Sequence, residues 1–393
     1  MQMDFHYYAT YCAAVLAGYS HEDSMEICYS AQFVDCCSRT LLSGLKAPLS
    51  AATTQLQLEL MNARTDPVGL QDITRIWASF HFLPGDLTAR PPRKTGLRYQ
   101  QKYRLICQPN GPLVKETVEL ARGKGTAAAG LAMHVLADTW AHRNFAGTPS
   151  LVINNTNYYF YEILNGNDRM VNFRHSPGAP DDLVMGVFSN SVYQDNENSI
   201  MNLGHGRAGH LPDYSFIRYR YLPAWADYDE VIKDNPAEYW QAFCQMVYAL
   251  QYLREKANTS GNGEQEGFET GVYAYETVKL LEDDIRAILE KRQIDACADW
   301  QALGGELAER EIPDFDLESL ENEYLSAAPE EKDGTLLGAF FLAALAQKSM
   351  VTNKIFLSGN LLAGWSVDFR EKGFRGIKDF RKLVEEARKE GKS

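Results

Sequence analysis

The sequence is short of positive charge. Its 393 residues include 39 Lys or Arg against 52 Asp or Glu, which gives a net charge of −13. Proteins that coat nucleic acid or anionic lipid normally present a basic face, so this balance argues against duplex nucleic acid as a partner. It leaves phosphate chemistry open, because a bound metal ion can supply a positive field locally.

Paired cysteines and long hydrophobic runs are also lacking. The seven cysteines include no C-x-x-C pair, and their odd number predicts free thiols in a reducing compartment. The most apolar run, 336–346, is far shorter than the roughly 20 residues of a membrane-spanning helix. No basic segment of a secretory signal follows Met1. We therefore expect a cytoplasmic protein without a transmembrane segment, and these features are also compatible with signal-less export.

The chain has no long strand-rich section, and most of it is typical of helix. One strong helix is predicted over about 114–145, rich in Ala, Leu and Met and stopped by Gly147 and Pro149. Other helical stretches occupy the first forty residues and most of the chain after 237. The sequence therefore predicts an all-α fold, a multi-helix bundle with long loops.

Composition divides the chain into two parts. Residues 150–225 have many Asn, Gly, Tyr and Pro, which is typical of long functional loops. The polar segment 259–267 is the best candidate boundary. We predict a metal-binding helical core over 1–258 that includes the loop region, and a C-terminal helical extension over 268–393 that packs on this core.

The sharpest motif is a histidine and aspartate stripe in the long predicted helix. His134, Asp138 and His142 are spaced by four residues, and each step of four rotates the helix face by only about 40°. The three side chains therefore share one stripe, and apolar neighbours such as Leu131 and Val135 indicate that it points inward. Imidazole and carboxylate at this spacing can bind zinc or a similar ion. A buried polar network without metal is the alternative.

A second group lies in the glycine-rich segment 204–213. His205, His210 and Asp213 can supply further metal ligands, and Arg207 can hold a phosphate through a bidentate contact. Glycines let the backbone approach a ligand closely. A turn with surface histidines is an equally good interpretation.

Three more candidates lie near the N-terminus and in the predicted helices. His6 follows Asp4 by two residues, and in extended backbone the two side chains share a face and can reach one ion. Asp35 interrupts the apolar stretch 31–37, where a buried carboxylate should be paired or metal-bound. His81 has aromatic neighbours and, taken alone, is more typical of a core histidine.

The order of these residues resembles the zinc-dependent phospholipase C and single-strand nuclease superfamily. Its members are all-α enzymes with a trinuclear zinc site, and their ligands run in the order N-terminal residue, His, Asp, His, H-x3-D, His, H-x3-E. Here the corresponding order is His6, Asp35, His81, His134, Asp138 and His142. The opening DFHYYATYCAAVLAGYS and the stretch 130–147 also resemble an uncharacterised bacterial family of similar length, which we associate with the same clan. The resemblance covers roughly residues 1–215.

Two elements of the superfamily pattern are missing. The final H-x3-E is absent, so His205, His210 and Asp213 are the candidates to replace it. The N-terminal Trp that binds metal through its free amine in secreted members is absent too, and Asp4 is the candidate to stand in for it.

The resemblance implies a zinc-dependent phosphoester hydrolase, phospholipase C-like or nuclease-like, with two or three ions. Other divalent ions fit the same residues. Such ions lower the pKa of a bound water and bind phosphoryl oxygens. Asp35 would orient or deprotonate that water, and Arg207 or Arg143 would stabilise charge developing on the phosphate. A small phosphoester or a zwitterionic lipid head group suits the net charge better than long nucleic acid.

Two other functions stay open at this point. The first is a non-catalytic, metal-stabilised helical scaffold or interaction protein whose C-terminal helices bind a partner. The second is a different metal-dependent hydrolase, such as an amidase or peptidase. No H-E-x-x-H motif is present, which argues against a zincin peptidase.

Overall fold

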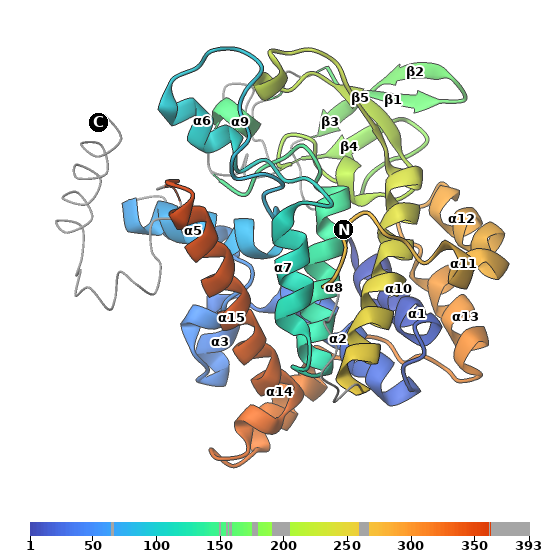
Figure 1. Ribbon diagram of the computed structural model, residues 1–393. Coiled ribbons are helices and arrows are strands. Elements are labelled where there is room, and N and C mark those ends of the chain that lie inside the picture. Colours follow the sequence, from blue (N-terminus) through green and yellow to red (C-terminus); the bar gives the residue numbers. More distant parts are fainter. Residues whose placement is uncertain are drawn as a thin grey trace.

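The computed structural model describes residues 1–63, 67–148, 151–154, 156, 159–174, 180–190, 205–258, 267–360 and 362. Helices lie side by side through the lower part of the molecule, and strands and loops lie above them (Figure 1). The prediction of an all-α fold is wrong, because the structure has a four-stranded antiparallel sheet and a two-stranded parallel sheet. All six strands fall within or just beyond the region predicted to be long loops.

The elements have the following bounds. The helices of the first half are α1 (Thr10–Leu16), α2 (His21–Cys36), α3 (Arg39–Leu45), α4 (Gln57–Ala63), α5 (Pro67–Phe80), α6 (Leu97–Tyr103), α7 (Pro112–Ala121), α8 (Thr126–Ala141) and α9 (Leu151–Asn154). Those of the second half are α10 (Asn235–Asn258), α11 (Tyr275–Val278), α12 (Glu282–Glu290), α13 (Cys297–Ala308), α14 (Leu317–Ser326) and α15 (Leu336–Leu357). The strands are β1 (Tyr161–Leu164), β2 (Asn167–Met170), β3 (Asn172–Arg174), β4 (Val187–Ser189), β5 (Arg218–Tyr221) and β6 (Val231–Asp234).

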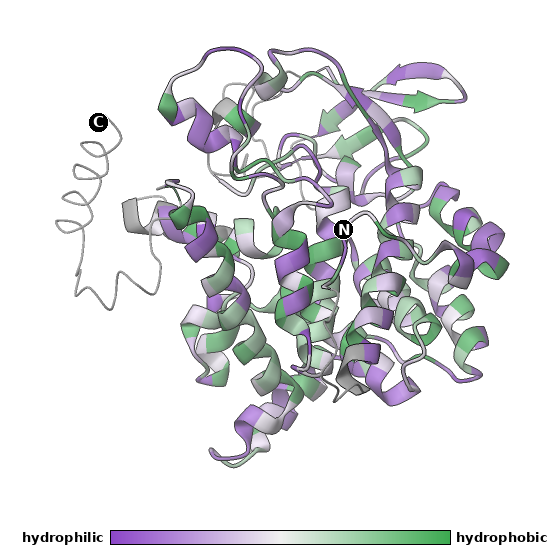
Figure 2. Ribbon diagram, viewed as in Figure 1, coloured by the Kyte–Doolittle hydropathy of each residue, from purple (hydrophilic) through white to green (hydrophobic). Residues whose placement is uncertain are grey.

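Helix α8 is the centre of the helical part. Every residue from Ala127 to Ala141 is buried, as expected of a helix that other elements cover on all sides. Helices α2, α7, α10 and α15 pack around it. The approach of α2 is so close that a Cβ added at Gly130 would lie 2.2 Å from the carbonyl oxygen of Ile27. Figure 2 shows hydrophobic residues gathered on the central helices and hydrophilic residues on outer ones such as α12 and α14.

The single helix predicted over 114–145 is two helices in the structure. Helix α7 ends at Ala121 and α8 begins at Thr126. Between them Gly123 and Gly125 have φ of +69° and +84°, a conformation that ends a helix and that glycine adopts at little cost. The break lets α7 pack against α8.

The four-stranded sheet has the order β2-β1-β5-β6, with all neighbours antiparallel. Strands β1 and β2 form a hairpin whose turn is Asn165-Gly166, both with positive φ, as a two-residue hairpin turn requires. Tyr219 and Tyr221 of β5 are buried, and Tyr221 stacks on Phe145, four residues beyond the end of α8. The sheet therefore packs over the end of the central helix. The parallel pair β3–β4 lies beside it.

The C-terminal helices pack on the N-terminal ones. Helix α13 contacts α1 and the short π-helix Asp4–Ala9, and α15 contacts α8 and α5. One hydrophobic cluster runs from Met1 to Ile355 and joins both predicted parts of the chain. No helix in the described part of the chain combines the length and hydropathy that a membrane span requires.

Candidate metal centre

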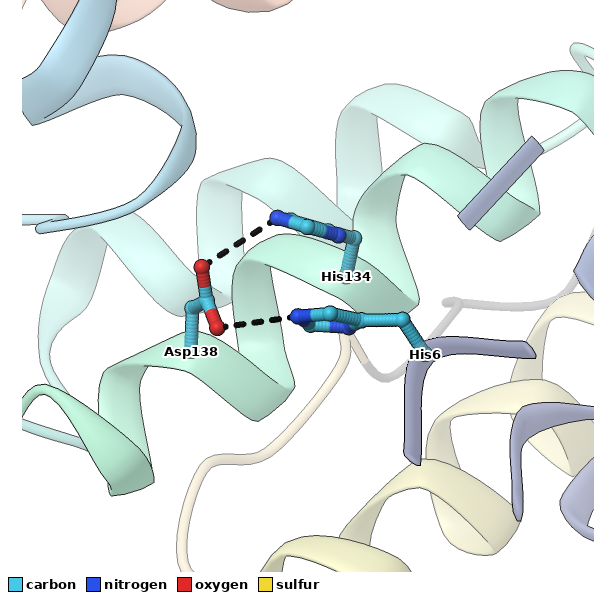
Figure 3. Close-up of side chains that lie close together, drawn as sticks. All are labelled: His6, His134 and Asp138. Carbon is cyan, nitrogen blue, oxygen red and sulfur yellow. Dashed lines mark hydrogen bonds and ion pairs between the residues drawn. The ribbon is translucent and has the colours of Figure 1, made fainter. Parts of the chain in front are cut away.

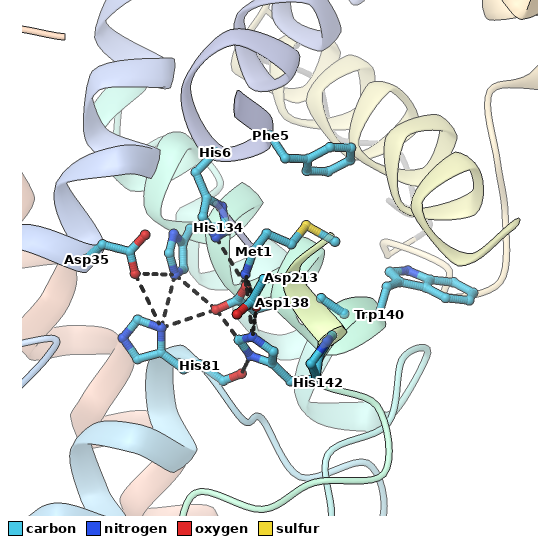
Figure 4. Close-up of polar contacts among 12 residues, drawn as sticks. Met1, Phe5, His6, Asp35, His81, His134, Asp138, Trp140, His142 and Asp213 are labelled. Carbon is cyan, nitrogen blue, oxygen red and sulfur yellow. Dashed lines mark hydrogen bonds and ion pairs between the residues drawn. The ribbon is translucent and has the colours of Figure 1, made fainter. Parts of the chain in front are cut away.

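Side chains from five separate segments meet beside the C-terminal half of α8 (Figure 4). The helix itself supplies His134 and Asp138, and His142 is the first residue after it. The other segments are the π-helix, the last turn of α2, the end of α5 and the turns over 205–213. They contribute His6, Asp35, His81, His205 and Asp213.

Asp138 is the hub of this cluster. It is 1% exposed, yet four nitrogen atoms lie within 3.2 Å of its carboxylate oxygens. Oδ1 lies 3.1 Å from His6 Nε2, and Oδ2 lies 3.2 Å from His134 Nε2 (Figure 3). The other two are His81 Nδ1, 3.1 Å from Oδ2, and the α-amine of Met1, 2.8 Å from Oδ1. Together with His6 and His134, this carboxylate would hold a metal ion.

The ligand atoms form three neighbouring groups, of which two share His134. Within each group the atoms lie within 4.8 Å of one another, close enough to bind one ion. The first group is His6, His134 and Asp138; the second is Asp35, His81 and His134; the third is His142, His205 and Asp213. The shared His134 and the contacts of Asp138 join them into one centre.

Backbone carbonyls orient most of the histidine rings. His134 Nδ1 donates to Ala31 O at 2.8 Å, and His142 Nδ1 donates to His81 O at 2.7 Å. His205 Nδ1 donates to Gly209 O at 2.9 Å, and His81 Nε2 donates to Thr53 O at 3.1 Å. In each case the second ring nitrogen faces the cluster. This arrangement, with one nitrogen held by a carbonyl and the other free to bind, is typical of metal-binding histidines.

The residues present fit a metal ion. His6 Nε2 and Asp138 Oδ1 face each other 3.1 Å apart, and both side chains are buried. The donor set of imidazole nitrogens and carboxylate oxygens is one that zinc and similar divalent ions prefer. Buried His and Asp clusters that can hold a metal ion are therefore a feature of this protein.

The electrostatics keep the donors in the protonation state that binds metal. Burial lowers the pKa of His6 to about 3 and those of His134 and His205 to about 4, so all three are neutral at pH 7. Burial opposes the charge on Asp138, but His142 and the Met1 ammonium hold its pKa well below the usual range. Burial likewise opposes the charge on Asp213, whose pKa is held low chiefly by His205 and the same ammonium.

The three groups contain eight of the nine residues predicted to be metal ligands. The exception is His210, whose side chain is 53% exposed and whose Nδ1 lies 3.7 Å from Asp213 Oδ2. Within the described residues His210 belongs to none of the three groups.

Asp35 differs from the other ligands in its exposure. Its side chain is 34% exposed, whereas those of His134 and Asp138 are almost completely buried. Its Oδ1 lies 3.8 Å from His81 Nδ1 and 3.9 Å from His134 Nε2. The last turn of α2 carries this carboxylate at the solvent-facing edge of the cluster, where it lies near two histidine rings.

The two arginines predicted to stabilise charge on a phosphate lie in different surroundings. Arg207 is buried, and its backbone carbonyl accepts a hydrogen bond from Asn190 Nδ2 at 3.2 Å. Arg143 is part-exposed, and its Nη1 lies 3.5 Å from Glu238 Oε1. A phosphate-binding role for Arg207 stays a prediction.

The α-amine of Met1 is the functional group that the sequence did not indicate. It lies 2.8 Å from Asp138 Oδ1, 3.3 Å from Asp213 Oδ1 and 3.4 Å from His142 Nε2. Asp4, the predicted substitute, instead accepts a hydrogen bond from the backbone of Phe5. The turn that brings the amine inward is made by Gln2, whose carbonyl accepts from Phe5 N and His6 N. In the sequence, only the short spacing from Met1 to His6 indicated that the α-amine lies near this histidine.

Comparison with known proteins gives one match. A family model described as "Family of unknown function (DUF6765)" covers residues 1–355, which include the whole cluster and the helices up to α15. No curated protein and no solved structure matches the chain.

Proposed function

The chain belongs to this family of unknown function, and for it we propose a zinc-dependent phosphoester hydrolase with two or three ions. The proposal rests on the three neighbouring groups of ligand atoms. The buried carboxylate of Asp138 joins these groups, and the carboxylate of Asp35 lies where the centre meets solvent. The resemblance of the ligand order to the zinc-dependent phospholipase C and single-strand nuclease superfamily supports the same conclusion. Asp213 with His205 would take the place of the missing H-x3-E.

The residues divide into binding and reacting roles. Zinc ions bound here would polarise phosphoryl oxygens and acidify a water. Asp35 is the candidate to orient that water and accept its proton, because it combines proximity to His81 and His134 with access to solvent. His142 and Asp213, 3.2 Å apart and nearly buried, bind and orient rather than exchange protons with solvent.

Small substrates fit this centre better than polymers. The net charge of −13 repels long polyanions, and the centre meets solvent at the edge that carries Asp35. We therefore propose small phosphodiesters, phosphomonoesters or the zwitterionic head groups of lipids as substrates.

The test is hydrolysis of bis-p-nitrophenyl phosphate and p-nitrophenyl phosphorylcholine by zinc-loaded protein. Asp35→Asn is expected to lower kcat at least 100-fold, a typical contribution of a general base. Asp23→Asn, on the exposed start of the same helix, is the matched control and should keep full activity. A zinc-loaded protein that hydrolyses neither ester would leave the metal-stabilised scaffold as the better account.

A further inference from the structure

A buried lysine holds the end of the helix that carries the central ligands. Lys233 of β6 is 0% exposed, and its Nζ lies 2.9 Å from Trp140 O and 3.3 Å from Ala141 O. These carbonyls are at the C-terminus of α8, where the helix leaves acceptors unpaired and where a positive charge is favourable. Lys233 thereby fixes the backbone from which His142 projects.

An asparagine two residues later holds the segment that carries Asp213. Asn235 is also 0% exposed, and its Nδ2 donates to Leu211 O and Tyr214 O, both at 2.8 Å. The first carbonyl belongs to the opening residue of the 3₁₀ turn Leu211–Asp213, and the second belongs to the residue that follows the turn. Asn235 N in turn donates to Ile217 O, which ties the start of α10 to the same loop.

The two contacts converge on one donor group. Lys233 holds the backbone beside His142, Asn235 holds the backbone beside Asp213, and the facing atoms of these ligands lie 3.2 Å apart. Both anchors come from one short junction between β6 and α10, so the spacing of the ligands depends on a single piece of backbone. We propose that Lys233 and Asn235 are positioning residues that set the geometry of the group His142, His205 and Asp213.

The energetics of Lys233 favour a positioning role over a purely stabilising one. Burying an ammonium is costly, even though Glu238 pairs with it here. An apolar side chain of similar length would fill the same space, and replacing a buried ion pair by apolar groups is often neutral or favourable for stability. An apolar side chain, however, cannot donate hydrogen bonds to the carbonyls of Trp140 and Ala141.

This inference rests on the proposed metal centre and is tested by metal binding, not by hydrolysis. The full-length chain is titrated with Co²⁺, whose visible absorption reports each site, and bound metal is counted after equilibrium dialysis. The variants are Lys233→Met paired with Glu238→Gln, which removes both charges together, and Asn235→Ala. Arg220→Met is the matched control, because Arg220 pairs with Asp168 and Glu230 on the same sheet.

We expect the test variants to bind one ion about 10- to 100-fold more weakly, the usual effect of losing the support of a metal ligand, with the remaining ions unaffected. The control should match wild type. Full-affinity binding of every ion by both test variants would overturn the inference and leave the metal centre standing. Loss of all ions together with the thermal transition in both variants would also overturn it, since it indicates a general structural role. A wild-type chain that binds no Co²⁺ would overturn the centre itself.

Discussion

At the scale of single residues, the site is built around one aspartate. Asp138 is buried and ionised, and its partners include one ammonium and two histidines that burial holds neutral, His6 and His134. Such a carboxylate needs compensating positive charge, which metal ions supply directly. The histidine–aspartate stripe could be predicted from residue spacing, because i and i+4 positions share a helix face. The α-amine could not, because its place depends on how the first turn folds.

The α-amine gives the metal-free protein a distinctive pH dependence. Burial lowers its pKa, but Asp138 and Asp213 outweigh this and raise it to about 11, against 8.0 ordinarily. The pKa of this amine is higher in the folded chain than in the unfolded chain. The charged amine therefore stabilises the folded protein fully below pH 8, and this stabilisation is lost as the pH rises through 11. The charged amine contributes about 4 kcal/mol to the free energy of unfolding.

Urea unfolding of metal-free protein at pH 7, 9 and 10.5 measures this effect. Asp138→Asn is the comparison, since it removes the closest carboxylate and should flatten the decline in stability above pH 8. Equal slopes in wild type and variant would show that the amine is not paired with Asp138.

At the scale of elements, local signals predicted some features and missed others. The helical character of 126–141 and the helices beyond 268 follow from composition and periodicity, and α12, α13, α14 and α15 lie where helices were expected. The break between α7 and α8 depended on Gly123 and Gly125. The hairpin of β1 and β2 turns at Asn165-Gly166, and its strands are only four residues long, so they do not stand out in a polar, glycine-rich region.

The distance between Asp35 and His134 depends on how closely α2 and α8 cross. Gly130 allows the close approach of the two helices. In Gly130→Ala the added Cβ meets Ile27 O and Ser30, so the helices must separate, at a cost of about 1–3 kcal/mol. Gly44→Ala is the control, because the space around Gly44 of α3 is open and alanine favours a helix by about 0.5–1 kcal/mol. Chemical denaturation should show opposite signs for the two changes. A stabilised Gly130→Ala protein would contradict the tight crossing.

At the scale of the whole molecule, the centre lies where the helical bundle meets the sheet. Ligands come from residues 6 to 213, and α10, α13 and α15 pack against the elements that hold them. Sequence order alone could not show that the loop region folds into a sheet over the end of α8. That sheet brings His205 and Asp213 to His142, through contacts between segments far apart in the chain.

Metal removal should therefore loosen the molecule as a whole. Ions that bind the folded chain and not the unfolded one stabilise it by mass action, by about 4 kcal/mol when the metal is at 1,000 times its Kd. Dialysis against a chelator should lower the Tm by several degrees, and added Zn²⁺ should restore it. An unchanged Tm would mean that the buried cluster is complete without metal.

The most direct test of the metal centre is the metal content of purified protein, measured by elemental mass spectrometry. We predict two or three zinc ions per chain in wild type, one fewer in Asp213→Ala, and the largest loss in the double variant His134→Ala/Asp138→Ala, because His134 belongs to two donor groups and Asp138 contacts ligands of all three. Folded wild-type protein without stoichiometric metal would contradict the account, and the cluster would then be a buried polar network.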